Sequence, residues 1–477
     1  MVHDVTQPTG IRGESRHIVT TLIVAIVLMT IYMSTLLPGL GHSGDTAKFQ
    51  FIGRVLGTPH STGYPTYLML NHAFTGLLPW GNLAWKSNLL SAIFATLACL
   101  VLFRILIVLS VRPSVAAATS LTFGLTRTFW SQAVIAEVYT LNALFVALVV
   151  LWLVQWSSRP DNLTAFRFAA LTYALSFGNH MTMITLLPAI LVFVITVDRR
   201  IYTNARLILF VIVCVTVGAA QYLYFFWRQQ AVPPAPMEMT APDFGTFWFY
   251  ATGAQFRHRM FSQPASDVIS IRVPLILGLI RQELGWLLLL VPVGASVLFD
   301  RRVLLLLGLG FAGLFFFIIN YTIPDIATYL IPASLFLCIT AGLGMEWLIS
   351  KIQGWRRRFP SVLFGIIPLI LLVGNFQHAN QRDNVFEARR TEDILSRVGH
   401  HAVIIAPDYH RGYYFRYYLI GEGKQRDDIY LVLQFDARVI AAYVHHAGDL
   451  AIPFQRLTVP PGLAVYVLDA IQAERLH

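Results

Sequence analysis

The sequence predicts an α-helical protein that crosses a membrane about eleven times and ends in a small α/β domain on the outer side. Of its 477 residues, 56% are hydrophobic and 13% are charged, whereas a soluble protein usually carries about 25% charged residues. Apolar runs long enough to cross a hydrocarbon core of about 30 Å alternate with polar turns. This apolar texture ends near residue 376. We therefore expect a membrane domain over residues 1–376 and an extracytoplasmic domain over residues 377–477.

Eleven apolar segments are the predicted crossings. They are Ile18–Leu37, Trp85–Leu109, Val115–Phe129, Val134–Trp156, Phe168–Phe177, Met183–Val197, Leu207–Trp227, Pro274–Phe299, Val303–Tyr321, Tyr329–Ile349 and Val362–Phe376. A shorter apolar run, Tyr67–Leu78, is expected to form an interfacial helix instead of a crossing.

Basic residues set the orientation of these segments. They cluster at alternate turns, at Arg12 and Arg16, Arg159 and Arg167, Arg199 and Arg200, Arg301 and Arg302, and Arg356–Arg358. Because Lys and Arg collect on the cytoplasmic side, the N-terminus is predicted to be inside, in the cell (inner) membrane. The first outer loop (residues 38–66), the long outer loop (residues 228–273) and the C-terminal domain then share the outer side. The first apolar segment lacks a small-residue cleavage site and is expected to remain as an anchor.

The net charge of +10 also arises from the basic residues at the predicted cytoplasmic turns. In a soluble protein such an excess could indicate a nucleic-acid partner, but here the basic residues mark cytoplasmic turns, so no nucleic acid is expected. The three cysteines, Cys99, Cys214 and Cys338, all lie inside apolar runs. No disulfide framework is therefore predicted.

The C-terminal domain has the pattern of alternating strands and helices. Predicted strands are His401–Ala406, Asp428–Leu433 and Leu463–Leu468, and predicted helices are His410–Ile420 and Ala437–His446. This alternation is typical of an α/β layer structure. The domain has no Gly-rich phosphate motif and no metal-ligand spacing, so we assign it no chemistry.

Most ionisable residues near apolar segments fall on the predicted outer side, where polar groups near a membrane are functional candidates. The candidates are Asp45, Lys48, His60, Tyr64, Arg127, Glu137, Tyr139, Asn179, His180, Arg257, Arg259 and Asp325. Because they gather at one face and not at the bilayer midplane, they indicate a site that serves the outer compartment.

Structural interpretations compete with the functional ones. Asp45 could cap the helix that begins beside it, His60 could support the turn at Tyr64, and Asn179 with His180 could close a helix end. Arg257 and Arg259 could be solvated loop charges, and the aromatic run Phe247–Tyr250 fits an interfacial anchor. Glu137, in an apolar stretch, needs a partner. Glu283 and Glu346 lie apart from the outer residues and are expected to pair with Arg281 or with charges on the inside.

Three ordered blocks resemble a known family. The blocks are SGDTAKFQF…VLGTPHSTGYPTYLML, FWSQAVIAEVYTLNALF and LSFGNHMTM, and TGAQFRHRMF and IPDIATYLIPA are similar to later blocks. The family belongs to the GT-C superfamily of multipass membrane glycosyltransferases and includes eukaryotic protein O-mannosyltransferases. The resemblance implies a GT-C-like fold, a polyprenyl-phosphate sugar donor and Asp45 as the catalytic base. Lys48 stands where the family has a Glu, and HSTGYP replaces an HPPGYP-like turn.

The residues are compatible with this chemistry. Polyprenyl phosphate is a good leaving group, so the reaction needs a carboxylate to deprotonate an acceptor hydroxyl and cations to neutralise the departing phosphate. Arg127, Arg257, Arg259 and Lys48 are the outer cations, and Arg suits bidentate phosphate contact. Direct attack inverts the anomeric centre. No cofactor is identified, no metal-ligand cluster is visible, and the use of a divalent metal is left open.

Two other functions compete with a glycosyltransferase that moves a mannose-like sugar to a protein or glycan. A transporter or flippase of lipid-linked sugars would carry polar residues near mid-membrane, often in repeated halves, and no internal repeat is visible here. A non-catalytic, binding-only member of the family would be compatible with the replacement at Lys48.

Overall fold

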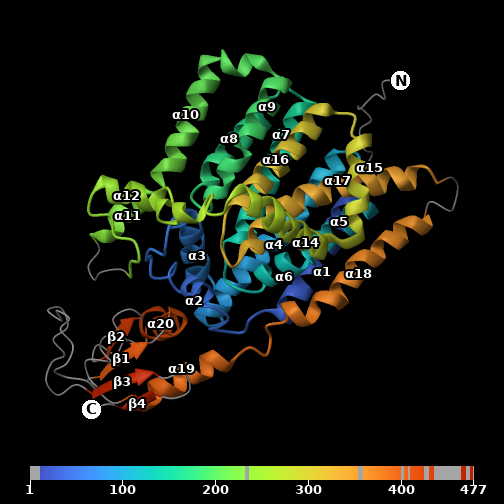
Figure 1. Cartoon of the computed structure of the whole chain (residues 1–477). Helices are drawn as coiled ribbons and strands as arrows, with labels where there is room; N and C mark the ends of the chain where they lie inside the picture. Colours follow the sequence, from blue (N-terminus) through green and yellow to red (C-terminus); the bar gives the residue numbers. More distant parts are fainter. Residues whose placement is uncertain are drawn as a thin grey trace.

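The computed structural model describes residues 11–230, 236–352, 358–398, 402–406, 409–423, 429–433, 464–468 and 473–475. The membrane part is helical throughout these residues (Figure 1). The predicted helix at Ala437–His446 and the basic residues Arg356 and Arg357 lie outside the described residues.

Seven helical segments in the described residues are long and apolar enough to cross a membrane. They contain α1 (Ile11–Thr35), α4 (Leu83–Val108), α7 (Tyr139–Ser158), α10 and α11 (Ala205–Ala220 and Leu223–Gln229), α13 to α15 (Ala265–Asp267, η4 Val268–Arg272, α14 Val273–Leu284, η5 Gly285–Leu289, α15 Leu290–Val297), α16 (Arg301–Asn320), and η6 with α17 (Ile326–Leu330 and Ile331–Ser350). Each of the seven lies at a predicted crossing. They are helices because a chain in contact with lipid must satisfy its backbone hydrogen bonds within its own segment.

The other four predicted crossings correspond to helices outside these seven segments. These are α5 (Pro113–Gly124), α8 (Thr164–Ser176), η1 with α9 (Met181–Leu186 and Leu187–Val197), and α18 (Arg358–Ala379). The number of eleven crossings therefore stays a prediction. The third predicted segment, Val115–Phe129, also ends early, and a separate helix α6 (Arg127–Ala133) follows it.

The helices divide into central and peripheral ones. In α7 and in the combined segment of η6 and α17, 78% and 83% of the residues of an 18-residue apolar stretch are buried, against 22% for α1. Helices α4, α7 and α17 contact one another and form the centre, while α1, α10, α14 and α16 expose apolar side chains on the outside of the bundle. Small residues allow close crossings between membrane helices: a Cβ on Gly294 of α15 would lie 1.8 Å from the Thr340 carbonyl oxygen on α17.

The outer loops fold into short helices. The first outer loop contains α2 (Gly44–Phe49) and leads into α3 (Pro65–Leu77), which matches the predicted interfacial helix. The long outer loop contains α12 (Phe244–Ala251) and η3 (Ala254–Arg259). The two loops are joined at an isolated parallel bridge between Thr58 and Met237. On the other side of the bundle, η2 (Arg199–Tyr202) follows α9.

The segment after α18 contains α19 (Phe386–Arg397), α20 (Tyr409–Arg416), η8 (Tyr417–Gly421) and four strands. The strands are β1 (Ala402–Ala406), β2 (Ile429–Leu433), β3 (Ala464–Leu468) and β4 (Ala473–Arg475). They form one sheet in the order β2-β1-β3-β4, with β1 parallel to β2 and β3 and with β4 antiparallel to β3. The first three lie where strands were predicted. That this segment is a domain of its own stays a prediction.

The C-terminal segment contacts the first outer loop. Figure 1 shows α20 next to α2, below the helical bundle, and the two helices pack against each other. The side chains of Tyr417 and Glu422 accept hydrogen bonds from the backbone N–H groups of Ala84 (3.1 Å) and Leu83 (3.0 Å) at the start of α4. The segment thus covers the region in which the sequence concentrates its candidate residues.

Candidate active site

Asp45 lies in the first turn of α2 but does not cap it. The N-cap is Ser43, whose Oγ accepts a hydrogen bond of 3.1 Å from the backbone N–H of Thr46. The competing interpretation of Asp45 as a simple helix cap is therefore wrong. Its side chain is 49% exposed.

The polar contacts of the Asp45 carboxylate in the described residues are all made by one of its two oxygens. Its Oδ1 lies 3.0 Å from Lys48 Nζ and 3.6 Å from His60 Nδ1, and it accepts a 2.7 Å hydrogen bond from the Tyr409 hydroxyl. Burial opposes ionisation of Asp45, but Lys48, His60 and Tyr409 together outweigh it and lower the pKa of this carboxyl well below its usual range. Asp45 is therefore ionised at neutral pH.

Lys48 is completely buried and surrounded by oxygen and nitrogen partners. Its ammonium lies 2.9 Å from Glu238 Oε1, donates to His60 Nδ1 at 2.8 Å, and also donates to the Tyr409 hydroxyl. Burial disfavours the charge, but the Glu238 and Asp45 carboxylates raise the pKa of Lys48. A buried charge is stable only when it is paired in this way. Glu238 and Tyr409 were not identified from the sequence.

His60 is held neutral by its surroundings. Burial, followed by the nearby Lys48 ammonium, lowers the pKa of His60 to about 3. Nδ1 accepts from Lys48, so a proton resides on Nε2 in the neutral ring, and Nε2 lies 3.2 Å from the Tyr64 hydroxyl. His60 therefore bridges the lysine network and the tyrosine that begins α3.

A second group of candidates lies beside this network. Glu137 accepts a 3.2 Å hydrogen bond from the Thr46 hydroxyl of α2, which supplies the partner that its position required. Tyr139 donates to Asp325 Oδ2 at 3.2 Å. Burial raises the pKa of Asp325. The three carboxylates Asp45, Glu137 and Asp325 thus converge from α2, the loop before α7 and the loop before η6.

Asn179 and His180 bond to nearby backbone groups, and the His180 ring also faces the candidate site. The His180 Nδ1 accepts from the Thr182 N–H at 3.3 Å and so caps η1, as the helix-end interpretation expected. Asn179 donates to the Val138 carbonyl at 3.2 Å. The His180 ring nevertheless faces the site, with its centroid 5.7 Å from that of Tyr139 and 6.3 Å from that of Tyr64.

The predicted outer cations separate into two groups. Arg257 and Arg259 lie on η3, where Arg259 stacks 5.6 Å above Phe256, whose ring centroid is 6.4 Å from that of His60. Arg257 is exposed. Arg127 instead lies 3.1 Å from His378 Nδ1 at the end of α18. The structure therefore brings Arg257 and Arg259 toward the Asp45 network and gives Arg127 different neighbours.

The two remaining acids have other roles. Glu346 pairs with Arg112 at 2.7 Å, as expected for a charge on the inside. Glu283 does not pair with Arg281; it accepts from the N–H and hydroxyl of Thr128 at the start of α6. Within the described residues, no group of three or more His, Cys, Asp or Glu side chains could hold a metal ion.

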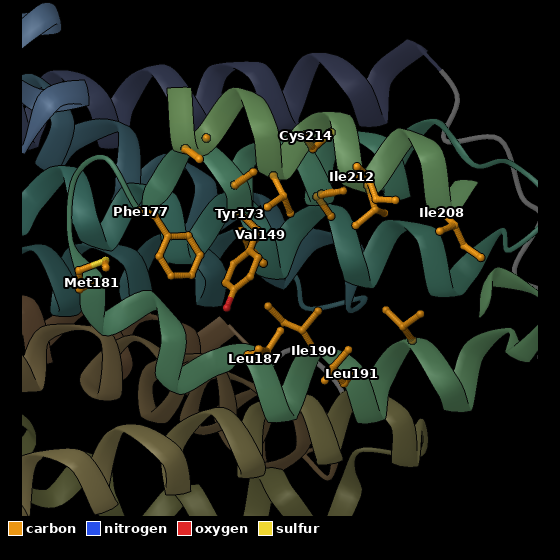
Figure 2. A pocket seen from close by; sticks show the side chains of 18 of the residues that line it. Val149, Tyr173, Phe177, Met181, Leu187, Ile190, Leu191, Ile208, Ile212 and Cys214 are labelled. Carbon is orange, nitrogen blue, oxygen red and sulfur yellow. The ribbon is translucent and has the colours of Figure 1, made fainter. Parts of the chain in front are cut away.

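An apolar cavity of about 850 Å³ opens beside the site, between α7, α8, α9, α10 and α12 (Figure 2). Figure 2 shows Tyr173 of α8 and Phe177, which directly follows α8, facing Leu187, Ile190 and Leu191 of α9 across it. Its lining includes Phe177, Met181 and Thr252, which are within a few residues of His180 and of η3. A long apolar ligand in this cavity could therefore reach the polar candidates with one end.

Comparisons with known proteins agree with the sequence resemblance. Residues 45–203 match the family model of the protein O-mannosyl-transferase TMEM260 N-terminal domain. Protein O-mannosyl-transferase TMEM260 of Mus musculus is 27% identical over 175 residues, 36% of this chain and 24% of that protein. The Dictyostelium discoideum protein of the same name is 24% identical over 131 residues, 27% of this chain and 16% of that protein. The match thus spans about a quarter or less of each relative.

Solved structures share the fold over most of the chain. The crystal structure of ArnT from Cupriavidus metallidurans bound to undecaprenyl phosphate has a TM-score of 0.58 at 14% identity and covers 91% of this chain and 95% of that one. An oligosaccharyltransferase from Archaeoglobus fulgidus, in complex with Zn and sulfate, has a TM-score of 0.54 at 12% identity, covering 88% and 62%. The resemblance stated from the sequence is confirmed: this chain shares the fold of ArnT and of the oligosaccharyltransferase, and its residues 45–203 match the family model of the TMEM260 protein O-mannosyl-transferase N-terminal domain.

Proposed function

We propose that this protein is an integral membrane glycosyltransferase that transfers a mannose-like sugar from a polyprenyl-phosphate donor to an acceptor hydroxyl at the outer face of the membrane. The observation that carries the proposal is Asp45: a half-exposed carboxylate, ionised and held on one oxygen, inside the segment that matches the family model. The names of the matched relatives favour a protein hydroxyl as the acceptor.

The apolar cavity supports a lipid carrier as the donor. It is lined by side chains that are almost all apolar, so a hydrocarbon chain can enter it from the lipid without burying an unpaired polar group. A polyprenyl chain in the cavity would leave its phosphate near His180 and the arginines of η3. The solved ArnT structure with undecaprenyl phosphate, which has the same fold, supports this class of ligand.

The proposed reaction is a direct displacement. The acceptor oxygen bonds to the anomeric carbon, the bond from that carbon to the phosphate oxygen breaks, and its electron pair leaves with polyprenyl phosphate. Asp45 receives the proton of the acceptor hydroxyl. Arg257 and Arg259 neutralise the charge that grows on the departing phosphate. One displacement inverts the anomeric configuration, and no metal is needed to balance the step.

The low pKa of Asp45 determines when the proton moves. A carboxylate in contact with Lys48, His60 and Tyr409 is a weak base toward an ordinary alcohol. The acceptor oxygen becomes far more acidic as it bonds to the anomeric carbon, so transfer to Asp45 becomes favourable late in the step. Before that point Asp45 orients the hydroxyl by accepting its hydrogen bond.

Incubation of the purified protein with a panel of polyprenyl-phosphate sugars and peptide acceptors tests the proposal. We expect release of polyprenyl phosphate and a glycoside of inverted configuration. Movement of the intact donor across a vesicle membrane without release would support a flippase instead, and donor binding with neither outcome would support a binding-only protein.

The proposed topology has its own test. We expect Arg54 and Ser396, which are both exposed, to react with an impermeant reagent from the same, outer side of the cell membrane when each is replaced by Cys. Labelling of the two positions from opposite sides would contradict the placement of the first outer loop and the C-terminal segment in one compartment.

A further inference from the structure

Tyr409, from the C-terminal segment, lies directly on the helix that carries Asp45. A Cβ built on Gly44 would be 2.5 Å from Tyr409 Cδ1 and 2.7 Å from its Cε1, so only glycine allows the ring to lie there. The backbone N–H of Gly44 also donates a 2.6 Å hydrogen bond to His410 Nδ1. The start of α20 is therefore fixed against the start of α2.

The Tyr409 hydroxyl connects the two ions of this network. It accepts a hydrogen bond from the Lys48 ammonium and donates one of 2.7 Å to Asp45 Oδ1. Lys48 and His60 approach the same Oδ1 atom. In the described part of the chain, Asp45 Oδ2 has no hydrogen-bond partner, and half of this side chain is exposed. The carboxylate is thus anchored by one oxygen and presents the other.

We propose that Tyr409 is a positioning residue that holds Asp45 by Oδ1 so that Oδ2 faces the acceptor hydroxyl. The inference rests on the proposed glycosyltransferase function and adds a contribution of the C-terminal segment to the reacting site itself. Orientation of a catalytic group is a large part of enzymatic rate enhancement, and small misplacements are expensive. Tyr409 acts through Asp45 and touches neither the donor nor the acceptor.

Other charged groups also act on Asp45 and must be considered in any test by pH. The Lys48 ammonium approaches it from α2 and favours the ionised form, and the neutral His60 ring approaches it from the first outer loop. Glu238, Glu137 and Asp325 are the neighbouring acids, from the long outer loop and the outer ends of α7 and η6. All five remain in a Tyr409 variant, so a change in Asp45 behaviour can be assigned to the lost hydroxyl.

Two substitutions test the inference in the full-length protein. Tyr409→Phe keeps the ring and removes only the hydroxyl, while Gly44→Ala keeps the hydroxyl and displaces the ring. We expect each to lower kcat about tenfold, the change that corresponds to one hydrogen bond to a charged group, with unchanged donor affinity. The acidic limb of the kcat profile is expected to move to higher pH in Tyr409→Phe. The double variant should be no worse than either single one.

Matched controls separate positioning from general damage. Tyr418→Phe removes a hydroxyl that bonds to the Ala388 carbonyl within the same segment, and Gly308→Ala adds a methyl group where nothing lies within 4 Å. Both should retain wild-type kcat. A Tyr409→Phe variant with wild-type kcat and an unmoved pH profile would overturn the inference.

A measurement without turnover separates this inference from the proposed function. In thermal unfolding, the Tm losses of Asp45→Ala and Tyr409→Phe should not add, because each variant removes the one hydrogen bond that the two side chains share. Strict additivity would overturn the inference. If the wild-type protein turned over none of the donors, only the proposed function would be overturned. The thermal-unfolding comparison of the single and double variants would still test the contact between Asp45 and Tyr409.

Discussion

Asp45 and Glu283 are both acids beside the start of a short helix, but their surroundings differ. Glu283 is 5% exposed, and its oxygens accept from the N–H and hydroxyl of Thr128 at the first turn of α6. Asp45 is half exposed, and its own helix is already capped by Ser43. A buried acid whose acceptors are used by backbone is structural, whereas an exposed acid held on one oxygen is available for chemistry.

The largest difference in sugar transfer is expected between the two single variants Asp45→Asn and Glu283→Gln. Asp45→Asn retains size and hydrogen bonding but cannot take a proton, so sugar transfer should fall by about 10²–10⁴, with donor binding and folding retained. Rates of polyprenyl phosphate release from purified protein measure this. If Asp45→Asn turned over near the wild-type rate, the base would have to be Glu137 or Asp325, and the contrast with Glu283 would disappear.

Lys48 is expected to matter more for stability than for donor binding. Lys48→Met removes the ammonium that pairs with Glu238 and Asp45 while preserving much of the buried volume. Breaking a buried ion pair from one side typically destabilises by about 3–5 kcal/mol. Denaturant unfolding in detergent should show this loss, and Lys48→Met combined with Glu238→Gln should recover part of it. A stable Lys48→Met variant with weakened donor affinity would instead assign Lys48 to the phosphate.

His60 is expected to make stability pH-dependent. An unfolded histidine titrates near pH 6.5, while burial and the Lys48 ammonium lower the pKa of folded His60 to about 3. The folded state therefore binds the proton less readily, and its stabilising contribution is complete above pH 6.5 and is lost as the pH falls toward 3. Unfolding measured between pH 7 and pH 4 should have a flatter slope in His60→Gln. An unchanged slope would mean that folding does not lower the pKa of His60.

Glu283→Gln should have the smallest effect. The amide oxygen can still accept from the start of α6, so we expect a loss of about 0.5–2 kcal/mol, in the range of a lost helix cap, and unaltered transfer. Thermal unfolding together with the transfer assay measures both quantities. A large drop in kcat without loss of stability would place Glu283 in the reaction and contradict its structural interpretation.

Local patterns predicted the helices well where nothing distant intervenes. The segment Trp85–Leu109 was expected to span the membrane, and α4 runs from Leu83 to Val108. Local patterns did not indicate the points at which a predicted crossing divides into two helices. These divisions depend on single side-chain contacts or single backbone angles, which hydrophobicity does not indicate. The predicted crossing Leu207–Trp227 divides at Gln221, whose side chain bonds to the Leu175 carbonyl, and Pro274–Phe299 divides at Gly285, where φ is 52°.

The sequence alone determined that the chain is a membrane protein, the order of its apolar segments and the candidacy of Asp45. These properties depend on hydrophobicity and charge along short stretches, which the order of residues specifies directly. Only the tertiary structure decided which groups hold Asp45. Glu238 and Tyr409 are 190 and 361 positions from Lys48, and neither lies in a motif that indicates a buried ammonium. Electrostatic partners depend on distance in space, so they exist only after α2, the long outer loop and α20 have converged.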